Sequence, residues 1–184
     1  MKLKAIPATV VAAMFVLVAA SPLLAQSHLG LAAVARTSKV KLTYAGRSAT
    51  VDLDSETGGD NGSLPGDPPH IYKVLFTAEK AGSLYLVANV RSHSPISDKN
   101  APCGGDSPQS VLWIKTDKTL KKFEVRSEIY ASCSYNYYDS KVKITKTAIS
   151  IDYGSKDKRH LTYDNTKPED GLVVTEERRA GPVN

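Results

Sequence analysis

The sequence lacks the spacing patterns that mark many hydrolases and zinc proteins. It contains no Gly-x-Ser-x-Gly, no His-Glu-x-x-His and no Cys-x-x-Cys, and no two of its four histidines stand two or four positions apart. Serine nucleophile elbows and zinc sites are recognised by such spacing. The sequence therefore gives no support to either class.

Long apolar runs and amphipathic helical patterns are also missing after residue 25. The first 25 residues have a basic start at Lys2 and Lys4, an apolar stretch over residues 10–20 and a small residue, Ala25, at the end. That order is typical of a secretory signal peptide, and the stretch is shorter than the ~18 residues of a membrane span. Residue 26 is Gln26, so the acylated cysteine of a lipoprotein is missing. We expect a periplasmic or secreted protein with no transmembrane segment after cleavage.

The net charge of the chain is small, and cysteine is rare. Cleavage after residue 25 leaves 159 residues, and the loss of Lys2 and Lys4 lowers the formal net charge from +5 to +3. That charge is too small to indicate nucleic-acid binding. In an exported chain the only two cysteines, Cys103 and Cys133, predict one disulfide. The alternatives are a reactive thiol or a metal-binding pair.

What the chain does have is short apolar runs with period-two alternation, separated by turn residues. This pattern predicts strands, and ten segments show it: residues 39–44, 49–53, 71–77, 84–90, 111–115, 123–130, 141–145, 148–153, 160–163 and 172–175. Residues 84–90 are the most continuously apolar, which favours a central position. We expect an all-β fold: a single antiparallel β-sandwich or barrel-like domain of about nine or ten short strands, with one disulfide.

The predicted boundaries follow from the same pattern. Residues 1–25 are the signal peptide, residues 26–38 a flexible leader, residues 39–175 the all-β domain and residues 176–184 a charged tail. The two cysteines flank a hairpin expected over residues 111–130, which reverses at Asp117. The segment over residues 54–70 is rich in Gly, Pro, Asn and Asp, and it is long for a simple connection.

Tyrosines and lysines provide the candidate binding surface. Tyr130, Tyr135, Tyr137 and Tyr138 surround Cys133, while Lys118, Lys121 and Lys122 crowd the hairpin tip. Tyrosine combines apolar area with a hydrogen-bonding hydroxyl and suits recognition. The alternatives are tyrosines that pack beside the disulfide and lysines that only keep a solvated face. Lys141, Lys143 and Lys146 form a second basic row, with the same two readings.

Carboxylates provide two further candidates. Asp52, Asp54, Glu56 and Asp60 alternate beside a glycine-rich loop, a weak candidate for calcium, which prefers several oxygen ligands. No other cofactor is expected. Asp152, Asp157, Asp164, Glu169 and Asp170 cluster in the C-terminal turns. A glycoside hydrolase needs two such groups at one cleft.

These observations favour a non-enzymatic exported binding module over an enzyme. It would hold a protein or an anionic cell-envelope component through its loops and its tyrosine and lysine surfaces, as an inhibitor or immunity-type protein does. The alternatives are an envelope-acting hydrolase that uses the C-terminal carboxylates and a calcium-stabilised adhesion-like domain.

Overall fold

A computed structural model describes residues 28–56, 67–93, 107–133, 137, 139–154 and 158–177, with backbone alone at 55, 56, 67 and 68. These residues form eleven strands and two short helical turns. The elements are β1 (Gly30–Ala33), β2 (Lys39–Tyr44), β3 (Arg47–Asp52), α1 (Leu53–Glu56), β4 (Asp67–Lys80), β5 (Ser83–His93), β6 (Gln109–Asp117), β7 (Phe123–Ala131), β8 (Lys141–Ile144), β9 (Ala148–Tyr153), β10 (Lys158–Asp164), η1 (Pro168–Asp170) and β11 (Val173–Glu177). The all-β prediction is confirmed.

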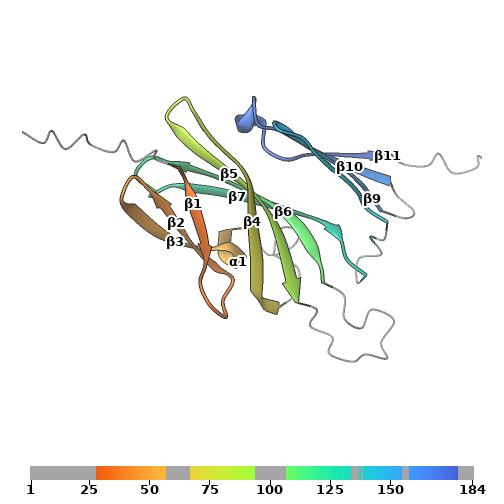
Figure 1. Cartoon of the computed structure of the whole chain (residues 1–184), viewed down its shortest axis with the longest axis horizontal. Coiled ribbons are helices and arrows are strands. Elements are labelled where there is room, and N and C mark those ends of the chain that lie inside the picture. Colours follow the sequence, from red (N-terminus) through yellow and green to blue (C-terminus); the bar gives the residue numbers. More distant parts are fainter. Residues whose placement is uncertain are drawn as a thin grey trace, which may run out of the picture.

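The strands form three antiparallel sheets, which lie as three layers (Figure 1). We call them the N-terminal sheet, in the order β1-β2-β3, the central sheet, β4-β5-β6-β7, and the C-terminal sheet, β11-β10-β9-β8. Each sheet is built from neighbours in sequence. Such local pairing follows from short turns between consecutive strands.

The central sheet is buried on both faces. Leu84, Leu86 and Ile114 belong to the core shared with the N-terminal sheet, whereas Val87 and Trp113 belong to the core shared with the C-terminal sheet. Successive side chains of a strand point to opposite faces. A strand covered on both sides is therefore apolar at nearly every position, which explains why Asn89 is the one amide or charged residue within residues 84–90 and confirms the central position of this strand.

The N-terminal sheet covers one face of the central sheet with strict alternation. In β2, Val40, Leu42 and Tyr44 are buried and the residues between them are exposed. Leu53 of α1 is fully buried in the same core. The sheet also includes β1, within the stretch that we expected to be a flexible leader. Leu29, just before β1, is buried in this core and anchors that segment.

The C-terminal sheet covers the opposite face. Its inner side contributes Ile149, Ile151, Tyr153, Leu161 and Tyr163 to the second core. The prediction of a two-layer sandwich or a barrel needs correction, because a third sheet occupies the face that would otherwise meet solvent. The count of nine or ten strands was also too low, and β11 extends two residues into the expected tail.

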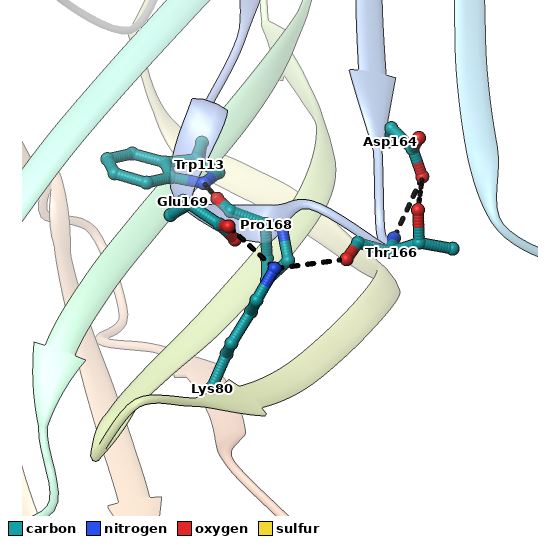
Figure 2. Close-up of polar contacts among 6 residues, drawn as sticks. All are labelled: Lys80, Trp113, Asp164, Thr166, Pro168 and Glu169. Carbon is teal, nitrogen blue, oxygen red and sulfur yellow. Dashed lines mark hydrogen bonds and ion pairs between the residues drawn. The ribbon is translucent and has the colours of Figure 1, made fainter.

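Polar contacts hold one end of the C-terminal sheet to the central sheet (Figure 2). The indole nitrogen of Trp113 donates a hydrogen bond of 3.1 Å to the carbonyl oxygen of Pro168 in η1. The ammonium group of Lys80 lies 2.6 Å from a Glu169 carboxylate oxygen and donates to the Thr166 carbonyl oxygen at 3.3 Å. The connection between β10 and β11 is therefore a docking point.

The hairpin expected between the cysteines is confirmed as β6 and β7, which pair in antiparallel register from Gln109 with Ala131 to Thr116 with Phe123. Asp117 organises the reversal, since one carboxylate oxygen accepts the backbone N–H groups of Lys121 and Lys122 at 2.9 and 3.0 Å. Cys133 follows β7, but Cys103 lies outside the described residues. The disulfide therefore stays a prediction.

No helix in the described ranges has the length and apolar character needed to cross a membrane.

Candidate functional site

A pocket of about 400 Å³ opens at one end of the C-terminal sheet. The residues that line it come from the start of β8, the end of β9, the start of β10 and the end of β11. Adjacent strands are antiparallel, so these four strand termini lie at the same end of the sheet. The lining residues are Asp139, Lys141, Asp152, Tyr153, Gly154, Lys158, Arg159, His160 and Glu177.

On the outer face of the sheet, a cross-strand pair forms part of the pocket. Asp152 of β9 stands directly opposite His160 of β10, and on its other side opposite Lys141 of β8. The Nδ1 atom of His160 donates to a carboxylate oxygen of Asp152 at 2.6 Å. Opposed residues on one sheet face are close enough to interact. The carboxylate fixes the orientation of the imidazole and leaves its Nε2 edge for other contacts.

On the inner face, Arg159 is held by two carboxylates. Its guanidinium lies 2.5 Å from Glu176 of β11 and 3.6 Å from Glu128 of β7. The hydroxyl of Tyr153 donates to the same Glu128 at 2.6 Å. Burial raises the pKa of Tyr153, and the hydrogen bond to the Glu128 carboxylate adds to that rise. Tyr153 is therefore a neutral donor, and this network ties the C-terminal sheet to the central one.

Tyr137 adds an aromatic side to this network. Its ring meets the Tyr153 ring edge-on, with centroids 5.2 Å apart, and the guanidinium carbon of Arg159 lies 5.8 Å from the Tyr137 centroid. Backbone hydrogen bonds with Ser132 position Tyr137. Of the four predicted tyrosines, it is the one that the structure places beside the pocket.

The rim of the pocket carries charges of both signs. Asp139, Lys141, Lys158 and Glu177 line it, and none of the ion pairs shown for the described residues uses them. Arg159, in contrast, is already neutralised by Glu128 and Glu176. Two cations and two carboxylates can thus engage a ligand without first breaking an internal pair. Within the described part of the chain no three His, Cys, Asp or Glu side chains are placed so that they could hold a metal ion together.

The other predicted tyrosines are placed differently. Tyr130 is 3% exposed, and its hydroxyl lies 2.9 Å from the side-chain oxygens of both Asn89 and Gln109, to one of which it donates its single proton. It belongs to the core and not to a binding surface. The sequence did not reveal this, because a strand tyrosine next to a turn looks the same on either face. Tyr135 and Tyr138 lie outside the described residues.

The three predicted lysines lie at the far end of the molecule from the pocket. Lys118 forms an ion pair with Glu79, and that carboxylate also accepts the hydroxyl of Tyr44 at 3.1 Å. These contacts join the tips of three hairpins. Lys121 and Lys122 have exposed side chains at the same tip. The lysines of the hairpin tip therefore lie apart from Tyr137, although the sequence grouped both in one candidate binding surface.

The C-terminal carboxylates that the structure describes do not gather at one cleft. Asp152 lines the pocket, whereas Asp164 lies at the other end of β10 and accepts the N–H of Thr166 at 2.8 Å. The hydrogen bonds from Thr166 hold the pKa of Asp164 below its usual range. The hydrogen bond from the Lys80 ammonium group likewise holds the pKa of Glu169 in η1 below its usual range. Asp170 belongs to η1 as well, and Asp157 lies outside the described residues.

The calcium candidates cannot be assembled from the described residues. Asp52 lies 3.4 Å from the ammonium group of Lys39, its cross-strand neighbour. Asp54 is exposed in α1. The Glu56 side chain and Asp60 lie outside the described residues. Asp52 therefore has an ion-pair partner within the N-terminal sheet.

The pocket itself was not predicted. Its residues are spread from position 139 to 177, and no motif links them. The sequence held one signal. If residues 141–145, 148–153 and 160–163 form three consecutive antiparallel strands, Lys141, Asp152 and His160 can stand opposite one another across those strands. Finding that alignment requires the pairing register of the three strands, which the sequence did not provide.

Comparison of the chain with protein-family models, with curated proteins and with solved structures gave no match.

Proposed function

We propose that the protein is an exported, non-enzymatic binding module whose binding site is the pocket at the open end of the C-terminal sheet. The basis for export is the signal-peptide pattern of residues 1–25. The proposal includes the disulfide between Cys103 and Cys133. Cys133 follows β7, which carries Glu128, so the bridge would strengthen the side of the pocket that Tyr137 occupies.

The observation that carries this proposal is the convergence of charges at the pocket rim. One space of about 400 Å³ is lined by Asp139 and Lys141 at the start of β8, by Lys158 of β10 and by Glu177 of β11. Small-ligand sites span roughly 300–1,000 Å³. A space of this size accepts one or two residues of a protein segment, or a sugar-sized group.

The mixed charge favours one partner class over another. A purely anionic envelope polymer would meet Asp139, Asp152 and Glu177 as well as the lysines, and like charges at close range oppose binding. A protein segment that presents both an acidic and a basic side chain matches the rim better. We therefore take a protein as the partner, with Tyr137 as an adjacent aromatic contact.

The hydrolase alternative has weaker support. A general acid at a glycosidic bond needs a raised pKa, so that it is protonated near neutral pH. Asp164 and Glu169 are shifted in the opposite direction, and their oxygens already serve in hydrogen bonds. For the calcium-stabilised alternative no described cluster of ligands speaks in its favour.

The test is capture of the partner by immobilised protein from an extract of the native cell envelope. Asp139→Ala with Lys158→Ala removes one charge of each sign from the rim and leaves the net charge unchanged. Lys121→Glu with Lys122→Glu changes the distant hairpin tip instead. We expect the wild type and the tip variant to capture the same component and the pocket variant to lose it.

The converse result would contradict the assignment. If the pocket variant binds as well as the wild type while the tip variant does not, the hairpin tip is the binding surface. Turnover of an envelope substrate by the purified protein, abolished by Asp152→Asn, would replace the binding module with an enzyme.

A further inference from the structure

The two outermost strands of the C-terminal sheet have unpaired edges. Within the described residues β8 pairs only with β9, and β11 pairs only with β10. All four residues of β8 and all five of β11 are exposed. An exposed edge presents unpaired N–H and C=O groups that can pair with another strand. Both edges of this sheet are therefore open to a partner strand.

The apolar row on the inner face reaches both edges. Val142 of β8 stands opposite Ile151, which stands opposite Leu161, which stands opposite Val174 of β11. The two middle residues, Ile151 and Leu161, are 1% and 0% exposed, whereas Val142 and Val174 are 45% and 36% exposed. The row thus ends in a half-exposed valine at each edge. Neither valine is fully covered by the rest of the chain.

The two edges carry opposite charges. Lys141 and Lys143 lie on the outer face of β8, and Glu177 ends β11 on the same face, whereas Glu176 is paired with Arg159 on the inner face. Two β8 edges brought together would oppose lysine to lysine, which is destabilising. A β8 edge facing a β11 edge brings a lysine near Glu177 instead. This asymmetry disfavours pairing of like edges and favours pairing of unlike ones.

We propose that copies of this chain join edge to edge, with β8 of one copy pairing with β11 of the next. Every neighbour in the sheet is antiparallel, so β8 and β11 run in opposite directions. A second copy in the same orientation therefore presents β11 antiparallel to β8, and the sheet continues from one copy into the next.

The register follows from the apolar residues. Placing Val142 opposite Val174 of a second copy also places Ile144, which is 49% exposed, opposite Leu172 of that copy. Both pairs lie on the inner face and extend the buried core. On the outer face Lys141 then stands opposite Thr175 and within diagonal reach of Glu177 of the second copy.

The contact is heterologous, so each added copy leaves one β8 edge and one β11 edge free. Such contacts build open chains unless the rotation between copies closes a ring. Sheet twist of roughly 20–25° per strand rotates each copy relative to the last. The assembly therefore grows as a helical string. Lysines at an edge also prevent pairing in many proteins, and the experiment separates the two roles.

The test is sedimentation velocity of the mature full chain over a range of concentrations. We expect the wild type to form species larger than a dimer, and high salt to weaken them. The variant Val142→Lys with Ile144→Lys blocks β8, and the variant Val174→Lys with Glu177→Lys blocks β11. All four positions are exposed, so both variants should fold, and unchanged circular dichroism checks this. Each variant alone should sediment as a monomer.

Mixing the two variants gives the decisive result. Each retains one intact edge of the opposite kind, so an equimolar mixture should form a heterodimer that grows no further. A wild type that stays monomeric at its highest soluble concentration overturns the proposal without reference to any variant. A wild-type dimer that does not grow, or a mixture that remains monomeric, overturns it as well.

Discussion

The three-layer packing makes a direct prediction about Trp113, the only tryptophan in the chain. This side chain is 1% exposed and belongs to the core between the central and C-terminal sheets. Its indole nitrogen satisfies the Pro168 carbonyl oxygen at 3.1 Å. Trp113→Phe should therefore weaken the docking of the C-terminal sheet while leaving the central sheet itself intact.

The magnitude follows from two losses. Leaving a buried carbonyl without its donor costs about 1–3 kcal/mol, and removing the outer ring atoms of the indole loses about 1–2 kcal/mol of apolar burial. Together we expect a decrease of about 2–5 kcal/mol in the free energy of unfolding. Urea unfolding followed by far-ultraviolet circular dichroism measures it, since the variant has no tryptophan fluorescence.

A matched control comes from β8. Val142→Ala truncates a half-exposed side chain of the same sheet and should cost less than about 0.5 kcal/mol for the isolated monomer. If Trp113→Phe costs no more than this control, the C-terminal sheet is not docked as the structure shows, and the three-layer description would be refuted.

Three further predictions concern the bridge, the hairpin turn and the reassigned tyrosine. Cys103→Ser should lower the free energy of unfolding by about 3–4 kcal/mol and the melting temperature by roughly 6–12 °C; an unchanged melting curve would mean that the bridge does not form or does not matter. Hydrogen bonds from Thr119 and from the backbone hold the pKa of Asp117 below its usual range. The stability that this provides is present above the unfolded-state pKa of about 4 and is lost as the pH falls toward the lower folded-state pKa. Asp117→Asn should flatten the decline of stability below pH 4, and an unaltered pH dependence would argue against the turn structure. Tyr130→Phe should lower the free energy of unfolding by about 1–3 kcal/mol in denaturant unfolding, because a half-buried amide oxygen of Asn89 or Gln109 loses its donor; an unchanged free energy of unfolding would contradict the placement of this hydroxyl in the core.

The parts of the fold that the sequence predicted are those that depend on neighbours along the chain. Alternation in residues 39–44 gave β2, and the nearly continuous apolar run of residues 84–90 gave a central strand. The hairpin around Asp117 was predicted from two apolar runs and a polar reversal. In each case the signal lies within a few residues, where side-chain direction and turn chemistry decide the structure.

The errors occurred where the decisive contact is distant. β1 was taken for a leader because four residues of the type Gly-Leu-Ala-Ala show no alternation and little strand preference. Pairing with β2 and the burial of Leu29 make it a strand. The sequence left Tyr130 open between a binding surface and packing beside the disulfide, because nothing near it in the sequence indicates Asn89 or Gln109. The side-chain oxygens of Asn89 and Gln109 that lie near the Tyr130 hydroxyl come from β5 and β6 of the central sheet.

The sequence by itself determined the fold class, the positions of most strands and the prediction of export, because periodicity, turn residues and the N-terminal pattern are local properties. Only the tertiary structure decided that a third sheet covers the second face of the central one. It also decided which charges meet at the pocket. Lys141, Asp152, Arg159 and Glu177 are brought together by the register of four strands, and register depends on the packing of whole sheets against one another.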